Sequence, residues 1–232
     1  MAVAPSEVHP LVLTQVGLFA ELPAEALAGL APSLRRRRYP KGQVIFFQGD
    51  PGASLCLIET GRVKIALTTP DGREFVLALL GPGDYFGELS LLDGEPRSAD
   101  AIALEACQLL LLQRDDFLRC LSAHPSVAIR LLAALSRRLR RTDQLVQEAA
   151  FLDVPARLAR VLLEQAQSAD AAGGAQPAGA GRLTQTELAG MIGATRESVN
   201  RWLSYFERQG LIRRQQGRIT IVRPEGLRQR IY

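Results

Sequence analysis

The sequence predicts an α+β chain in which a small β-barrel or sandwich is followed by one long helix and then by a compact helical unit. Between Gly42 and Leu112, short apolar runs are separated by glycines, which is typical of many short strands joined by turns. Residues 126–154 contain neither proline nor glycine and are rich in leucine, arginine, glutamine and alanine, which favours helix. The segment from Arg182 to Tyr232 holds ten arginines against four glutamates, a net charge of +6 in a chain whose total is +4. We therefore expect three domains, over 1–125, 126–152 and 153–232.

Composition excludes several classes of protein. Hydrophobic residues make up 47% of the 232 residues and charged residues 22%, which is typical of a globular chain. No apolar stretch reaches the roughly 18 residues that span a membrane, and the N-terminus lacks a secretory-signal pattern, so we expect a cytoplasmic protein that does not associate with a membrane. Cys56, Cys107 and Cys120 are far apart, and His9 and His124 are the only histidines, so we expect no metal site.

The glycine-punctuated block predicts a barrel or sandwich preceded by a short helix over Pro23–Leu30. Pro70-Asp71-Gly72 has the chemistry of a hairpin turn. The predicted strands are Val44–Phe47, Leu55–Ile58, Val63–Leu67, Phe75–Leu80 and Leu109–Leu112.

The long helix, predicted over Ser126–Val154, carries a heptad seam. The seam positions, spaced 4, 3, 4, 3, 4, 3, are Ala128, Leu132, Leu135, Leu139, Thr142, Val146 and Ala149. A narrow stripe held for three heptads favours pairing with a second copy of the helix, so we expect a parallel homodimer. The alternative is an amphipathic helix that lies on its own domain.

Beyond this helix we predict a second helix over Pro155–Gln167 and then a flexible, exposed loop over Ser168–Gly181, because the loop sequence is a low-complexity run of alanine and glycine.

The C-terminal unit has the order of elements of a winged helix-turn-helix. Thr184 and Glu187 form a capping box at the start of one helix, Gly193 marks a turn, and a second helix begins near Thr195. The apolar positions Val199, Trp202, Leu203 and Phe206 of the second helix are predicted to face the core. A two-stranded wing is predicted from Gly210-Leu211-Ile212 and Gly217–Ile221.

The basic charge and the polar start of the second helix indicate binding of double-stranded DNA, with this helix in the major groove. Arginine can fork onto guanine, glutamate can accept from the cytosine amino group, and serine can hold a phosphate. We expect DNA contacts from Thr184, Gln185, Thr195, Arg196, Glu197, Ser198, Asn200 and Arg201. The alternative is a pair of helices that merely carry surface charge.

A second candidate site lies in the barrel, where Gly83–Ser90 is followed by Pro96–Ala99. Arg97 offers a bidentate ion pair to a phosphodiester, and Ser98 with nearby backbone N–H groups can donate to its oxygens. Glu88 can accept from a ribose hydroxyl. The alternative is a structural salt bridge between the arginine and the glutamate.

These motifs carry a family resemblance. Gly87-Glu88-Leu89-Ser90-Leu91 followed by Pro96-Arg97-Ser98-Ala99 resembles the phosphate-binding cassette of cyclic-nucleotide-binding domains. Together with Ser136–Leu139, Ala150–Val154 and Thr195–Arg201, it makes nearly the whole chain resemble the CRP/FNR family of bacterial transcription regulators.

The resemblance implies a double-stranded β-helix (jelly-roll) sensor, a dimerisation helix, a winged helix-turn-helix and no catalytic activity. It implies a palindromic TGTGA-like operator with half-sites about 34 Å apart. It also implies that RNA polymerase is a partner, near the basic run Arg35–Arg38, although a solvated charge cluster is the alternative for that run. The nucleotide site it implies comprises Gly87, Glu88, Leu89, Arg97, Ser98, Ala99, Arg138, Thr142 and Asp143.

The effector expected from the resemblance is cyclic AMP. Asp143 stands where cyclic-AMP-binding relatives have serine, and a carboxylate can accept twice from the N1–H and N2–H groups of guanine. Cyclic GMP or cyclic di-GMP is therefore an alternative effector, and a constitutive regulator without a nucleotide is another. A barrel enzyme with a DNA-binding tail is a third reading, although such enzymes usually need several histidines in the barrel.

Overall fold

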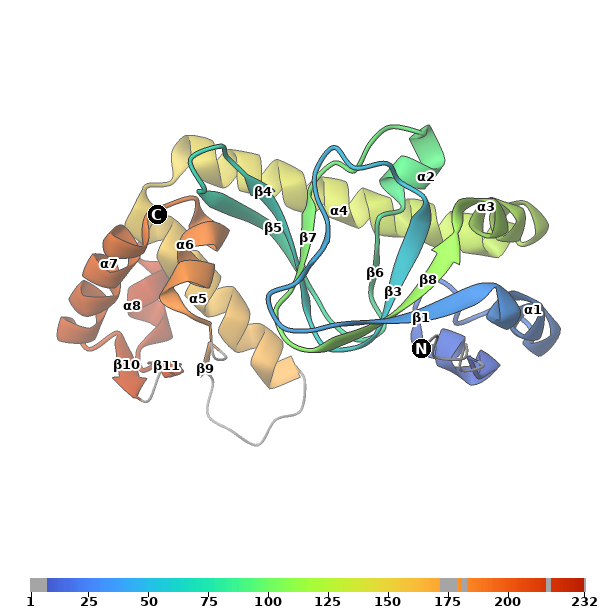
Figure 1. Ribbon diagram of the computed structural model, residues 1–232. Helices are drawn as coiled ribbons and strands as arrows, with labels where there is room; N and C mark the ends of the chain where they lie inside the picture. The colour runs from blue at the N-terminus through green and yellow to red at the C-terminus, as the bar shows by residue number, and fades with distance from the viewer. Residues whose placement is uncertain (1–7, 172–178, 181–182, 216–217, 232) are drawn as a thin grey trace. The chain divides into compact units, whose positions relative to one another are not determined.

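The computed structural model describes residues 8–171, 179–180, 183–215 and 218–231 (Figure 1). The chain forms two compact units, one made of Met1–Thr68 with Leu77–Arg140 and the other of Thr69–Val76 with Arg141–Tyr232. The helix α4 (Pro125–Phe151) contributes residues to both units.

The first unit is a roll of two antiparallel four-stranded sheets, with strand orders β1-β8-β3-β6 and β2-β7-β4-β5. Its strands are β1 (Leu34–Tyr39), β2 (Val44–Phe46), β3 (Ser54–Thr60), β4 (Val63–Thr68), β5 (Glu74–Leu80), β6 (Tyr85–Phe86), β7 (Asp100–Ala103) and β8 (Cys107–Gln113). Its helices are η1 (Pro10–Gln15), α1 (Ala24–Leu30), η2 (Ala31–Ser33), α2 (Leu89–Asp93), α3 (Arg114–Ala123) and the first part of α4. This agrees with the small barrel or sandwich that the glycine-punctuated block predicts and with the jelly roll that the family resemblance implies.

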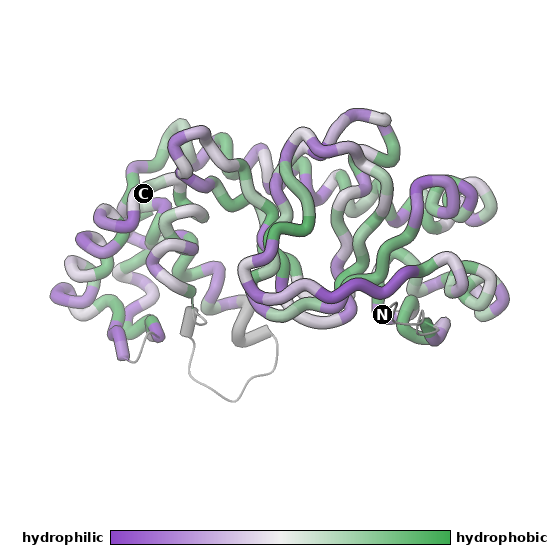
Figure 2. Tube along the Cα trace, in the orientation of Figure 1, coloured by the Kyte–Doolittle hydropathy of each residue, from purple (hydrophilic) through white to green (hydrophobic). Residues whose placement is uncertain are grey.

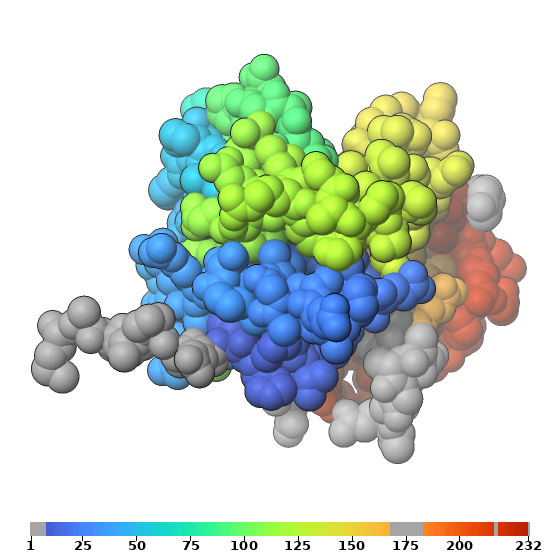
Figure 3. All heavy atoms as spheres, turned by 90° about the vertical axis from the view of Figure 1, so that its right-hand side faces the viewer, coloured from blue at the N-terminus to red at the C-terminus, as the bar shows by residue number. Residues whose placement is uncertain are grey.

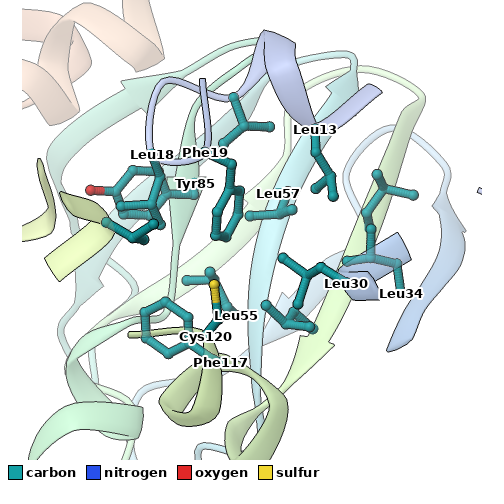
Figure 4. Close-up of a cluster of buried hydrophobic side chains, with 14 of the residues drawn as sticks. Leu13, Leu18, Phe19, Leu30, Leu34, Leu55, Leu57, Tyr85, Phe117 and Cys120 are labelled. Carbon is teal, nitrogen blue, oxygen red and sulfur yellow. The ribbon is translucent and has the colours of Figure 1, made fainter. Parts of the chain in front are cut away.

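Both faces of the first sheet are covered by apolar side chains. Neighbouring side chains of β3 point to opposite sides of the sheet, so alternate residues join different cores. Leu55 and Leu57 join a cluster with the N-terminal segment and α3, whereas Cys56 and Ile58 join the core between the two sheets. Figure 4 shows Leu13, Phe19 and Phe117 converging on Leu55 and Leu57. In Figure 3 the blue N-terminal segment and the green α3 lie next to each other on the face turned to the viewer.

The five predicted strands are confirmed, and three further strands, β1, β6 and β7, were not predicted. The basic run Arg35–Arg38 belongs to β1, an edge strand paired only with β8, and Figure 2 shows it as a hydrophilic stretch. Arg36 donates from Nε and Nη2 to the Glu59 carboxylate, both at 2.7 Å, so this arginine is part of a cross-strand ion pair rather than a solvated charge.

The second unit contains a helix-turn-helix and a small sheet. Its elements are the end of α4, α5 (Val154–Ala171), β9 (Gly179–Ala180), α6 (Gln185–Ile192), α7 (Arg196–Arg208), β10 (Ile212–Gln215), β11 (Arg218–Ile221) and α8 (Pro224–Arg228). The predicted pair of wing strands is present as β10 and β11, whereas Gly217 lies outside the described residues. A third strand, β9, pairs with β11 and was not predicted.

The prediction of one loop over Ser168–Gly181 is wrong in two places. Residues 168–171 continue α5, which agrees with the high helix propensity of alanine. Gly179–Ala180 pairs with β11 through backbone hydrogen bonds, which need no large side chain. Residues 172–178 and 181 of the predicted loop lie outside the described residues.

The predicted long helix ends at Phe151 rather than at Val154. Asp153 stands between the two helices, and its Oδ1 accepts a hydrogen bond from the backbone N–H of Ala156 at 3.0 Å, as a residue at the start of a helix does.

Within the described ranges 8–171, 179–180, 183–215 and 218–231, no single helix is long and apolar enough to cross a membrane. The one pair of helices there that passes by length and composition, α3 with α4, is bent by 110°. No cluster of three or more histidine, cysteine, aspartate or glutamate side chains that could hold a metal ion occurs within those ranges.

Candidate functional sites

The cradle between β6 and β7 begins at Gly87, whose φ is +83°. A Cβ atom at this position would lie 2.4 Å from Nη1 of Arg97 and 3.2 Å from its Cζ. Glycine is therefore required at Gly87 for two reasons, because it tolerates the left-handed backbone and because it lets the guanidinium approach the main chain.

Arg97 is buried, with 5% of its surface exposed. Its Nη1 donates to the carbonyl oxygen of Gly87 at 2.6 Å and its Nη2 to that of Ser54 at 2.7 Å. Its guanidinium lies 4.2 Å from the centre of the Phe46 ring. Burial lowers the pKa of Arg97 from its ordinary value, and the Nε–H group is buried without a partner among the described residues.

Glu88 is buried even more completely, with 2% of its surface exposed. Its Oε1 accepts from Nη1 of Arg138 at 2.5 Å, and Nη2 of Arg138 donates to the Tyr85 carbonyl oxygen at 2.5 Å. Its Oε2 is buried and finds no partner in the described part of the chain. The predicted alternative, a structural bridge between Glu88 and Arg97, is wrong in its partner, because the ion pair of Glu88 is with Arg138.

The cradle therefore contains an open donor, Nε of Arg97, and an open acceptor, Oε2 of Glu88. Each buried polar atom without a partner costs roughly 1–3 kcal/mol, so the arrangement fits a molecule that brings both an acceptor and a donor. A sugar with an anionic phosphodiester has both groups.

The other predicted cradle residues differ in exposure. Ala99 is buried, Ser98 is exposed, and Leu89 is 42% exposed at the start of α2. Cys56 lies near Arg97, and burial raises the pKa of its thiol to about 12, although the arginine charge opposes the shift. This thiol is therefore neutral at physiological pH.

The helix α4 has two apolar stripes. Val127 and Leu131 are buried in the core of the first unit. By contrast, Leu132, Leu139 and Val146 of the heptad seam are each 63% exposed. Leu135 of the seam is partly buried against this core, but Leu132, Leu139 and Val146 are not covered, so packing of α4 on its own domain accounts for only part of the seam.

Thr142 and Asp143 are both exposed on α4. Thr142 follows Arg138 by four residues, which places the two on one face of the helix.

The first helix of the helix-turn-helix begins with the predicted capping box. Oγ1 of Thr184 accepts from the backbone N–H of Glu187 at 3.1 Å, and the Glu187 carboxylate accepts from the backbone N–H of Thr184 at 2.6 Å. The helix ends at Gly193 with φ of +60°, the left-handed conformation expected of a turn glycine.

The second helix, α7, begins at Thr195, whose Oγ1 accepts from the backbone N–H of Ser198 at 3.2 Å. Its predicted core face is confirmed for Val199, Leu203 and Phe206, which are buried, whereas Trp202 is half-buried. Its exposed face carries Arg196, Glu197, Asn200 and Arg201. The arrangement presents two arginines, a glutamate and an amide on one helix start, the groups that read base edges.

Several contact residues were not predicted. Phe46, Ser54 and Tyr85 hold the cradle arginines, and Arg214 of β10 contacts α7. Phe46 and Ser54 lie far from Arg97 in the sequence, so no local spacing indicates them. Tyr85 lies within the candidate segment Gly83–Ser90 but acts through its backbone carbonyl oxygen, and Arg214 is one of ten arginines in the C-terminal segment, so neither role is visible in the sequence.

Comparison with known proteins gives two family matches. Residues 36–124 match the cyclic nucleotide-binding domain, and residues 156–230 match the Crp-like helix-turn-helix domain.

Relatives match over most of their length. A CRP-like cAMP-activated global transcriptional regulator of Mycobacterium tuberculosis is 38% identical, over 94% of this chain and 98% of its own. The cyclic AMP receptor protein of Thermus thermophilus is 39% identical, over 83% and 90%. Among solved structures, the c-di-GMP responsive global regulator CLP of Xanthomonas campestris has a TM-score of 0.76 and 27% identity, over 86% of this chain and 99% of its own.

Proposed function

Because the chain belongs to the CRP/FNR family of bacterial transcription regulators, which bind DNA and are not enzymes, we propose that it is a homodimer whose binding to a palindromic TGTGA-like operator is gated by cyclic AMP. The domains for this function are 1–125 for the sensor, 126–152 for dimerisation and 153–232 for DNA.

The observation that carries the sensor role is the pair of open polar atoms in the cradle. The phosphodiester oxygens of a cyclic nucleotide accept from Nε of Arg97, and a ribose hydroxyl donates to Oε2 of Glu88. The proposed contact set is completed by Gly87, Leu89, Ser98, Ala99, Arg138, Thr142 and Asp143. The Mycobacterium and Thermus relatives, both named for cyclic AMP, support this effector.

Asp143 favours a second candidate effector. Its carboxylate is exposed on α4 and can accept from both N1–H and N2–H of guanine, so cyclic GMP or cyclic di-GMP is the rival. The structural relative from Xanthomonas, named for c-di-GMP, supports this alternative.

The exposed seam supports the homodimer. Covering Leu132, Leu139 and Val146 with the same face of a second helix removes apolar surface from water and brings Thr142 of each protomer to the interface. The effector site and the dimer interface then share α4, which couples the occupancy of one to the geometry of the other.

On DNA, the proposed contacts come from Thr184 and Gln185 of the first helix and from Thr195, Arg196, Glu197, Ser198, Asn200 and Arg201 of the second. Recognition helices of a dimer reach successive major grooves about 34 Å apart, which explains a palindrome.

RNA polymerase is the proposed protein partner. Arg35, Arg37 and Arg38 of β1 are exposed and offer it a positive surface. A regulator with these partners acts in the cytoplasm.

Calorimetric titration of the full chain with cyclic AMP, cyclic GMP and cyclic di-GMP tests the sensor. We expect selective micromolar binding of cyclic AMP, lost in Arg97→Ala and kept in Arg73→Ala, a matched removal of an exposed arginine. If Asp143→Ser turns a preference for a guanine nucleotide into one for cyclic AMP, the rival is correct. Binding of none of the three would leave a constitutive regulator.

A further inference from the structure

The amide side chain of Asn200 is held on one side only. Its Oδ1 accepts from Nε2 of Gln185 at 3.2 Å and from Nη1 of Arg214 at 3.2 Å. Asn200 itself is exposed near the start of α7, between Arg196 and Arg201 on the surface that faces DNA in a helix-turn-helix.

Arg214 is fixed independently of Asn200. Its backbone N–H and its Nε donate to the two carboxylate oxygens of Glu207 at 2.9 and 2.8 Å, and its Nη2 donates to Ser204 Oγ at 3.0 Å. These hydrogen bonds hold the pKa of Glu207 below its ordinary value, so the carboxylate stays charged. One arginine on a wing strand thus contacts three side chains of α7, at positions 200, 204 and 207.

These contacts decide which end of the amide meets the DNA. A guanidinium has five N–H donors and no acceptor, so the atom of Asn200 that faces Arg214 has to be the oxygen. The nitrogen, Nδ2, is then the atom left for a base. The usual pairing of asparagine with adenine uses the oxygen and the nitrogen together, to meet N6–H and N7, and here the oxygen is already engaged.

We propose that Asn200 determines operator specificity as a pure hydrogen-bond donor, reading an acceptor edge, O6/N7 of guanine or O4 of thymine, with Arg214 as the residue that positions it. This rests on the proposed operator binding and adds the base edge that one residue reads.

The test is selection of operators from a library randomised across the half-site, with the full chain and saturating cyclic AMP. Asn200→Asp keeps the shape and the acceptor for Gln185 and Arg214 but replaces the donor with a second acceptor. We expect one base position to change from guanine or thymine in the wild type to cytosine, whose N4 amino group donates. Asn200→Ala lowers the wild-type preference at the same position about fivefold or more.

Positioning is tested with two arginines of β10. Arg214→Ala frees the amide of Asn200 to rotate. We therefore expect adenine to be selected more often at the base position that Asn200 reads, and the selected bases at the other positions of the half-site to stay the same. Arg213→Ala removes the neighbouring exposed arginine, and we expect it to lower affinity for all sequences equally.

The outcomes separate this proposal from the operator proposal. A wild-type preference for adenine that Asn200→Ala abolishes, or identical selected sequences for the wild type and both Asn200 variants, would overturn the donor-only assignment. Selection of a sequence unlike TGTGA refutes the proposed operator, while the comparison of wild type with Asn200→Asp still decides the edge read. Enrichment of no sequence refutes both.

Discussion

Two glycines of the cradle form a matched pair for testing how Arg97 is held. Gly87 and Gly94 have φ values of +83° and +79°, so alanine is strained by a similar amount at either position. A Cβ at Gly94 meets nothing within 4 Å, whereas a Cβ at Gly87 lies 2.4 Å from Nη1 of Arg97. The pair therefore separates backbone strain from displacement of the arginine.

The expected magnitudes follow from these contacts. An L-residue in the left-handed region costs about 1–2 kcal/mol, which is the full expected loss of unfolding free energy for Gly94→Ala. Gly87→Ala also pushes Arg97 off the Gly87 and Ser54 carbonyls, and hydrogen bonds to a charged group contribute about 1.5–3 kcal/mol each. Two such hydrogen bonds add about 3–6 kcal/mol to the strain, so we expect a total loss of about 4–8 kcal/mol for Gly87→Ala.

Urea denaturation measures both losses, and calorimetry measures cyclic-nucleotide affinity. Gly87→Ala should weaken nucleotide binding at least a hundredfold. The displaced guanidinium can no longer donate to the phosphodiester, and a charge-assisted hydrogen bond of this kind contributes about 3 kcal/mol of binding free energy. Gly94→Ala should bind like the wild type. In an Arg97→Ala background, Gly87→Ala should cost only the backbone strain. Equal losses for the two glycine variants, or full affinity in Gly87→Ala, would show that the missing Cβ of Gly87 is not what allows Arg97 to occupy its place.

Three further predictions concern the cap, the seam and a thiol. Thr184→Ala removes a capping hydrogen bond and should lower the unfolding free energy by about 1 kcal/mol in urea, while Thr186→Ala, exposed on the same helix, should change it little. Leu139→Glu places a charge on the seam and should turn the dimer into a monomer in sedimentation analysis. Gln144→Glu lies off the seam and should leave the dimer intact. A Leu139→Glu protein that is still a dimer would contradict dimerisation through the seam. The Cys56 thiol, whose pKa burial raises to about 12, should react with a thiol reagent at pH 9 far more slowly in the folded protein than after unfolding, because a much smaller fraction of it is ionised at that pH; equal labelling rates before and after unfolding would contradict this.

The sequence predicts the strands that fill a core better than those at an edge. Leu55–Ile58 and Leu109–Leu112 are apolar runs because both faces of β3 and β8 are buried. β1 escapes prediction because four of its six residues are arginine. An edge strand tolerates them, since it needs a partner on one side only and the charged heads reach water.

The candidate sites are also only partly predictable from the sequence. Gly87, Glu88 and Arg97 are predictable because the cradle is nearly continuous in sequence. The partner of Glu88 and the ring beneath Arg97 come from α4 and β2, and only the folded chain brings them there. The orientation of Asn200 likewise depends on a wing strand that carries one relevant arginine among ten in the C-terminal segment.

Gating of operator binding by a nucleotide is measured by fluorescence anisotropy of a labelled TGTGA palindrome with and without cyclic AMP. We expect the full chain to bind at least tenfold more tightly with saturating cyclic AMP, equivalent to about 1.4 kcal/mol of coupling, and expect Arg97→Ala to lose this response while keeping its basal affinity. Equal operator affinity with and without cyclic AMP, cyclic GMP and cyclic di-GMP would contradict nucleotide gating and identify a constitutive regulator.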